Sequence, residues 1–254
     1  MTATNGREDS GSCREAMLRV MAAILAMLMF CMLCVVAGGL SCLRGINRCC
    51  GCKLKKLDPI FYEDWFTFNV NSSTLRVTYR DVYSDLSCRL KVGVKAPNIQ
   101  LITLEGVKKT VFDFQKPNRP LVINFGSCSW LPFMSNIGQY NDLISKFGHI
   151  SDFLTIYTSE AHPLDEWALL NHRKFSRYQH TTLEERIHAA SVMRNEGIQG
   201  DLVVDSLDNE GPLLYSSLPE RLYVILDGSI IYRGGMGPAM YNPREVSNLL
   251  LKHV

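Results

Sequence analysis

The sequence predicts a mixed α/β domain behind one N-terminal membrane-spanning helix. Between Arg19 and Arg44, 24 consecutive residues carry no charge. From about residue 58 onward, short apolar runs alternate with stretches of helical periodicity, the pattern of a sheet flanked by helices. The 254 residues carry 27 Lys+Arg against 25 Asp+Glu, and 20% of them are charged. This balance excludes a largely disordered chain and a nucleic-acid binder that works through bulk positive charge.

The uncharged stretch, residues 20–43, is long enough at 1.5 Å per residue to cross a hydrocarbon core of about 30 Å. A cleaved secretory signal is the alternative, but the stretch exceeds the usual apolar core of a signal peptide. Five basic residues follow it closely, and three lie in the N-terminal tail, residues 1–19. The positive-inside rule therefore predicts a single-pass protein whose C-terminal part is cytosolic, at the endoplasmic reticulum or plasma membrane.

Residues 44–91 read as a basic, cysteine-rich juxtamembrane linker that ends in an amphipathic stretch. Seven of the nine cysteines precede residue 60, which excludes a disulfide scaffold spread through a core. The crowded cluster Cys49-Cys50-Gly51-Cys52 suits palmitoylation and contact with anionic lipid better than zinc, although unmodified thiols are equally compatible. Asn71-Ser72-Ser73 is a formal glycosylation acceptor, and its use would require a luminal domain.

Residues 92–254 are predicted to form the folded domain. Apolar runs predict strands, and 3.6-residue periodicity predicts helices. Asp227-Gly228 predicts a tight hairpin turn, since these residues tolerate positive φ. Thr182 with Glu185 forms a capping box, and Asn242-Pro243 is a good helix start. The predicted strands are 98–104, 121–125, 153–157, 202–204, 222–226 and 229–232, and the predicted helices are 133–147, 182–194 and 242–252.

The turn at residues 126–133 is the first candidate for chemistry. It follows the predicted strand Leu121–Phe125 and leads into a helix. Backbone N–H groups and the helix dipole at such a turn stabilise an anion, so a thiolate or selenolate placed there is activated. Cys128 lies in this turn. It is a candidate nucleophile, with a resolving or buried thiol as the alternative.

Several segments, read in order, resemble the iodothyronine deiodinases. They are Arg119–Ser129, Asp152–Tyr157, Glu160–Trp167, Gln179-His180 with Leu183–Arg186, Val204-Asp205, Leu218–Ile225, and Gly234-Gly235 with Gly237-Pro238 and Tyr241. The stretch Gly93–Pro97 is similar to the start of peroxiredoxin-type domains. The resemblance implies a thioredoxin-like, peroxiredoxin-type mixed sheet with flanking helices. It also implies a homodimer and reductive removal of iodine from thyroid hormones by a selenocysteine with a reducing thiol cosubstrate.

The sequence departs from the family at the position of the catalytic selenocysteine. The family's selenocysteine lies two residues after the motif cysteine, where this sequence has Trp130. An indole has no ionisable chalcogen and cannot attack iodine. Three explanations are open: the selenocysteine codon UGA was read as the tryptophan codon UGG, the protein is an inactive hormone-binding member, or Cys128 has become the nucleophile of a thiol peroxidase or reductase.

Other side chains fit the chemistry without reference to the family. His162 follows the predicted strand 153–157, so it lies at the same sheet edge as the turn after Phe125 if the two strands are parallel. Such a histidine can exchange a proton near neutral pH, and Glu160 can orient it. The resemblance makes His180, Ser129 and Tyr157 candidate substrate contacts.

Two departures bear on hormone binding. Glu166 stands where relatives commonly have glycine, and Met236 stands where they often have Lys or Arg. Arg233 or Lys174 is a candidate replacement for the missing cation. The sequence predicts no metal site, no bound cofactor and no nucleic-acid partner, because ligand spacing and phosphate loops are lacking. The expected partners are an iodothyronine, a thiol reductant, membrane lipid and a second copy of the chain.

Overall fold

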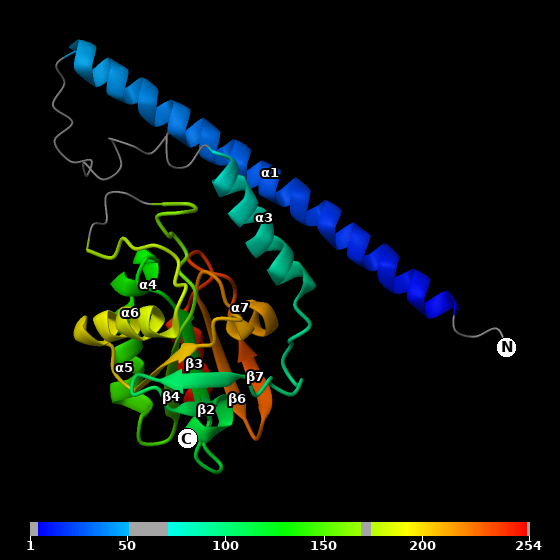
Figure 1. The fold of residues 1–254 in the computed structure, drawn as a ribbon, viewed down its shortest axis with the longest axis vertical. Helices are drawn as coiled ribbons and strands as arrows, with labels where there is room; N and C mark the ends of the chain where they lie inside the picture. Colours follow the sequence, from blue (N-terminus) through cyan, green and yellow to red (C-terminus); the bar gives the residue numbers. More distant parts are fainter. Residues whose placement is uncertain (1–4, 51–70, 169–173, 253–254) are drawn as a thin grey trace. The chain divides into compact units, whose positions relative to one another are not determined.

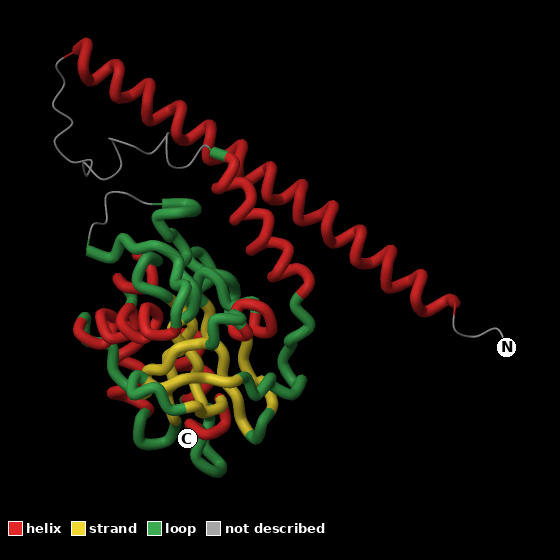
Figure 2. Tube along the Cα trace, viewed as in Figure 1, coloured by secondary structure: helices red, strands yellow, loops and turns green. Residues whose placement is uncertain are grey.

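The computed structural model describes residues 5–50, 71–168 and 174–252. The chain forms two compact units: Met1–Ser87 with Leu164–Ser176, and Cys88–Pro163 with Arg177–Val254. The second unit is therefore built from two stretches of chain. The first unit contains the helices α1 (Asn5–Cys50) and α3 (Ser72–Ser87). Figures 1 and 2 show both helices and the strand-rich second unit.

Helix α1 contains one segment, Cys13–Val36, that is long and apolar enough to cross a membrane. This segment overlaps the predicted span at residues 20–43. Among the described side chains of this segment most are exposed to solvent in the isolated chain, as expected of a helix surrounded by lipid. Part of the predicted linker is helical: α1 continues to Cys50, and α3 occupies residues 72–87. The predicted aromatic stretch 61–68 lies outside the described residues, as do the side chains of Cys49, Cys50 and Cys52.

The second unit is built on a seven-stranded mixed sheet, with the strand order β2-β1-β5-β4-β3-β6-β7. The strands are β1 (Gln100–Thr103), β2 (Lys108–Thr110), β3 (Leu121–Gly126), β4 (Asp152–Tyr157), β5 (Asp201–Asp205), β6 (Arg221–Leu226) and β7 (Ser229–Arg233). β3, β4 and β5 are parallel, and the other neighbours are antiparallel. Figure 2 shows the strands in yellow at the centre of this unit. The expected mixed, thioredoxin-like sheet with flanking helices is confirmed.

The central strands are buried on both faces, which explains their continuous apolar runs. Every residue of β3 and β4 is buried. The apolar core includes Phe125, which packs against Tyr215 and Tyr223 with ring centroids 5.1 and 6.2 Å away. The remaining helical elements are η2 (Val111–Phe114), α4 (Leu131–Ser135), α5 (Ile137–Phe147), α6 (Leu183–Asn195), α7 (Glu210–Tyr215) and α8 (Pro243–Leu250).

The predicted helix starts and the predicted hairpin turn are present in the structure. Thr182 and Glu185 form the predicted capping box of α6, and the Asn242 side chain accepts from the Arg244 N–H at the start of α8. Asp227 and Gly228 both have positive φ, as the predicted hairpin requires. The helix predicted over 133–147 was wrong in one respect, because Asn136 leaves helical geometry and separates α4 from α5.

The parallel pairing of β3 with β4 positions the candidate site. Gly126 pairs with Tyr157, so both strands end at the same edge of the sheet. The turn after β3 and the loop after β4 therefore leave this edge side by side, as expected from the carboxyl ends of parallel strands. Gly126 has a steric role, since a Cβ there would overlap the Phe133 ring.

Candidate active site

Residue 130 stands at the junction of the turn and the helix α4. Trp130 is the residue that caps α4, and its N–H donates to the Ser127 carbonyl at 3.3 Å. α4 has only five residues, so its dipole is small. Stabilisation of an anion at this turn must come mainly from neighbouring side chains and N–H groups.

His162 lies directly against residue 130. The Trp130 indole stacks on the His162 imidazole with ring centroids 5.2 Å apart and an interplanar angle of 25°. The His162 side chain is buried, and its backbone N–H donates to Ser129 Oγ at 3.1 Å. Ser129 thus ties the loop after β4 to the turn after β3, which holds the imidazole beside position 130.

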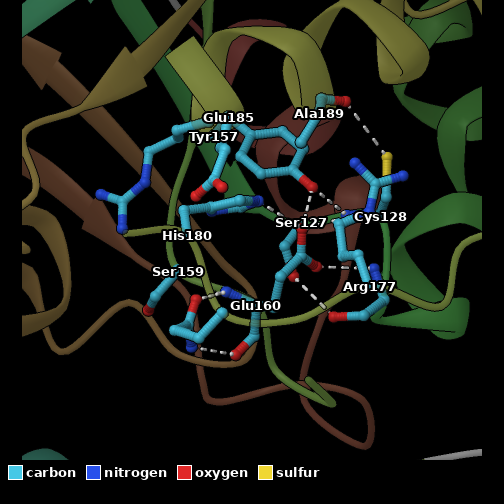
Figure 3. Close-up of polar contacts among 12 residues, drawn as sticks. Ser127, Cys128, Tyr157, Ser159, Glu160, Arg177, His180, Glu185 and Ala189 are labelled. Carbon is cyan, nitrogen blue, oxygen red and sulfur yellow. Dashed lines mark hydrogen bonds and ion pairs between the residues drawn. The ribbon is translucent and has the colours of Figure 1, made fainter. Parts of the chain in front are cut away.

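Glu160 is the polar centre of the site (Figure 3). One carboxylate oxygen, Oε2, accepts from the Ser129 N–H at 3.0 Å. The other, Oε1, accepts from the Tyr157 hydroxyl and lies 3.2 Å from Nε2 of His180. The Arg177 guanidinium is 3.7 Å from the same oxygen. The carboxylate is fully buried, so these contacts replace the water it has lost.

The contacts also set the charge of this cluster. Burial raises the pKa of Glu160, but its contacts with His180, Ser129 and Tyr157 outweigh burial and hold the pKa below its ordinary value. Burial and the Glu160 charge together raise the pKa of Tyr157 well above its usual range. Near neutral pH the cluster therefore contains a carboxylate that accepts a hydrogen bond from a neutral phenol, an arrangement suited to relaying protons.

Gln179 and Arg177 complete the cluster but were not among the predicted site residues. The Gln179 side chain accepts from the Glu160 N–H at 2.8 Å and donates to its carbonyl at 3.2 Å. The motif Gln179-His180 was a usable signal for the first residue. Arg177 lies 17 positions after Glu160, and no local pattern connects the two.

Cys128 lies in the same turn but has the properties of a buried thiol. It is 0% exposed, and its Sγ donates to the Ala189 carbonyl at 3.6 Å. Burial raises its pKa to about 12, and the nearby Arg177 offsets only part of the rise. At neutral pH such a thiol carries almost no thiolate, which is the reactive form.

The structure shows the surroundings of the two residues that depart from the family pattern, Glu166 and Met236. Glu166 forms an ion pair with Arg80 of α3 at 3.4 Å, within the first unit. Met236 lies in the loop after β7. Of the candidate replacement cations, Arg233 donates to the Tyr223 hydroxyl at 3.4 Å, and Lys174 lies over the Phe175 ring. Among the described residues, no group of three or more His, Cys, Asp or Glu side chains could hold a metal ion.

A family model described as iodothyronine deiodinase matches residues 16–254. Type I iodothyronine deiodinase of Xenopus laevis is 40% identical over 200 residues, which cover 77% of each chain. Thyroxine 5-deiodinase of Bos taurus is 36% identical over 71% of this chain, and that of Gallus gallus is 39% identical over 63%. The chain spans only 60% and 62% of the lengths of these last two relatives.

Solved structures are more distant. The thioredoxin domain of a thiol-disulfide oxidoreductase from Bacteroides vulgatus has 15% sequence identity and a TM-score of 0.46. The match covers 65% of this chain and 99% of that domain. A thiol-disulfide oxidoreductase from Bacteroides fragilis has 16% identity and a TM-score of 0.45 over 63% of this chain and 100% of that one.

Proposed function

Because this chain belongs to the iodothyronine deiodinase family, we propose that it is a membrane-anchored enzyme that removes iodine reductively from thyroid hormones, using a thiol cosubstrate. One observation carries the proposal. Residue 130, the family's nucleophile position, lies against His162, and Ser129 next to it is bonded to both Glu160 and His162. The nucleophile position and the proton-handling groups therefore form one connected cluster.

The proposed reaction assigns a role to each group. A chalcogen at residue 130 takes the iodine as a selenenyl or sulfenyl iodide, and the electrons of the carbon–iodine bond stay on the ring, which takes up a proton. Glu160 and His162 supply and return protons. His180, Ser129 and Tyr157 contact the substrate. The external thiol then displaces iodide, and a second thiol releases a disulfide and regenerates the nucleophile. Cys128 assists this regeneration only if it leaves its buried position.

This chemistry requires a chalcogen at residue 130, which in the family is selenocysteine, since an indole cannot form a bond to iodine. The transcript codon at this position, together with a search for a downstream selenocysteine-insertion element, is the decisive test. UGA with such an element supports the selenoenzyme. Full-length protein made from that transcript should release iodide from thyroxine under excess dithiol, whereas UGG without the element ends the selenoenzyme proposal.

A second candidate function is hormone binding without turnover. The stacking of Trp130 on His162 favours hormone binding without turnover. The indole occupies the position of the nucleophile and packs against the imidazole. This function predicts saturable iodothyronine binding with no iodide release.

A thiol peroxidase centred on Cys128 is the third candidate function. The burial of the Cys128 thiol and its raised pKa weigh against this function. A Cys128→Ser protein with full peroxide turnover would eliminate it.

We also propose a single membrane pass, a cytosolic C-terminal domain, contact of the juxtamembrane region with lipid, and a homodimer formed through the span. The resemblance also suggested a dimer contact at Asp152–Tyr157, but every residue of this strand is buried and both its edges are paired within the sheet, so it does not supply one. The basic residues after the span support the orientation. Crosslinking in intact membranes tests the dimer, and a monomer under conditions that preserve activity would contradict it.

A further inference from the structure

Glu220 is a buried carboxyl that the proposed mechanism does not use. It precedes β6 and is 0% exposed. Neither of its carboxyl oxygens has a hydrogen-bond partner among the described residues. Its neighbour Arg221, equally buried, shows the usual arrangement: its guanidinium donates to the carbonyls of Ser216 and Gly234, both at 2.8 Å. Burying a carboxyl without such partners costs free energy of folding, so the position of Glu220 needs an explanation.

The surroundings of Glu220 connect it to residue 130. The Trp130 indole approaches the Glu220 carboxyl closely enough to lower its pKa, without reaching the geometry of a hydrogen bond. Burial and the charge of Glu220 together raise the pKa of Tyr241, so this hydroxyl also lies near the carboxyl. Gly237 covers the carboxyl so tightly that a Cβ there would overlap it. Glu220 therefore faces position 130 from a different loop than Glu160 and His162.

The protonation of Glu220 fits a proton donor. Burial raises its pKa to about 7, and the contact with Trp130 offsets only part of the rise. Near neutral pH both the acid and its conjugate base are then populated, the condition under which a general acid works best. Glu160, by contrast, has a lowered pKa and is a carboxylate at the same pH. The environments of the two carboxyls near residue 130 thus shift their pKa values in opposite directions.

We propose that Glu220 is the acid that delivers a proton to the aromatic carbon losing iodine, from a different loop than the one that carries Glu160 and His162. This rests on the proposed deiodinase function. In the balanced step, the chalcogen anion at residue 130 bonds to iodine and the carbon–iodine bond breaks. Its electron pair takes the Glu220 proton, which leaves an aryl C–H, a chalcogen–iodine bond and the Glu220 carboxylate. The thiol cosubstrate then displaces iodide, and its proton restores the acid.

The first test uses the protein as it stands, because Trp130 is itself a reporter. In full-length protein in detergent micelles, Trp130 fluorescence should change with pH around a midpoint of about 7. The change should vanish in Glu220→Gln and in Trp130→Phe. It should persist in Asp205→Asn, which removes another buried carboxyl whose pKa burial raises to about 7. It should also persist in His162→Gln, which removes the imidazole stacked on Trp130 and so separates its effect on the fluorescence from that of Glu220. Loss in His162→Gln with retention in Glu220→Gln overturns the proposal.

The second test measures the chemistry in a Trp130→Cys background with excess dithiol. Adding Glu220→Gln should lower kcat for iodide release at least about 100-fold and leave KM within about threefold. Glu220→Asp should restore part of the rate, and Asp205→Asn should change it less than threefold. An unchanged kcat in Glu220→Gln refutes the catalytic role. Absence of iodide release from both Trp130→Cys and the selenocysteine form refutes the deiodinase function itself, while the fluorescence titration still reports whether Glu220 ionises beside residue 130.

Discussion

Glu160 shows how one side chain can organise a site. Its two oxygens serve Ser129, Tyr157, Arg177 and His180, which come from the turn after β3, the end of β4 and the segment before α6. Sequence reasoning found most of these residues through the family motifs. It could not supply their contacts, because hydrogen bonds between distant segments leave no local pattern.

We expect Glu160→Gln, introduced together with Trp130→Cys, to lower kcat/KM for iodide release by about 10²–10⁴-fold. The amide keeps an acceptor for one N–H but loses the charge that holds Arg177 and His180. Initial-rate measurements of iodide release check this. Glu184→Gln, at an exposed position in the first turn of α6, is the matched control and should leave the rate unchanged. Equal rates for the two variants would contradict a role for Glu160.

Asp205 makes the stability of the protein depend on pH. It accepts from the N–H groups of Ser206 and Gly211, both at 2.9 Å, yet burial raises its pKa from 3.8 to about 7. The folded state then holds a proton that the unfolded state releases between these values. The stabilising contribution is fully present below about pH 4 and is lost as the pH rises through about 7.

Asp205→Asn should therefore flatten the fall of the unfolding free energy between pH 5 and pH 7. The slope removed is at most about 1.4 kcal/mol per pH unit, and Glu220 should still contribute its own slope. The variant should also be about 1–3 kcal/mol less stable at pH 5, because the amide nitrogen cannot accept a hydrogen bond. Urea unfolding at several pH values measures both effects, and an unaltered slope would contradict the assignment.

At the scale of elements, periodicity and caps predicted most of the strands and the helices α6 and α8, while short or polar elements escaped. α7 has six residues and contains Gly211-Pro212, a composition that reads as a loop. α3 lies in what reads as a linker, and its β-branched and polar residues are weak helix formers. Its buried side chains Val77 and Val82 show that tertiary contacts stabilise it, which a local pattern cannot reveal.

The end of β3 gives a prediction at this scale. A Cβ at Gly126 would overlap the Phe133 ring, so Gly126→Ala must displace α4 and the turn that carries residue 130. We expect a loss of about 1–3 kcal/mol in unfolding free energy. Gly138→Ala is the matched control, since nothing lies within 4 Å of its Cβ position on the exposed face of α5, and it should gain up to about 1 kcal/mol. Similar stabilities for the two variants would show that the turn adapts freely.

At the scale of the whole molecule, the proposed membrane orientation can be tested at Asn71, the formal glycosylation acceptor. Its side chain already has a structural role, accepting from the Thr74 N–H at 2.9 Å at the start of α3. A cytosolic domain predicts no glycan at Asn71 in protein from eukaryotic cells. Treatment with an N-glycosidase should leave its electrophoretic mobility unchanged, and a shift that Asn71→Gln abolishes would reverse the proposed orientation.

The segment Leu164–Ser176 interrupts the second unit, and this offers a place at which the chain could be split into two polypeptides. The chain leaves the thioredoxin-like unit after Pro163 and returns to it at Arg177. The two stretches of that unit are joined through the middle of its sheet, where β4 pairs with β5 and β3 pairs with β6. A gene split between codons 164 and 176 should thus yield two polypeptides that reassemble by strand pairing, with His162 on one fragment and His180 on the other. Activity recovered on mixing would make this enzyme a two-part complementation reporter.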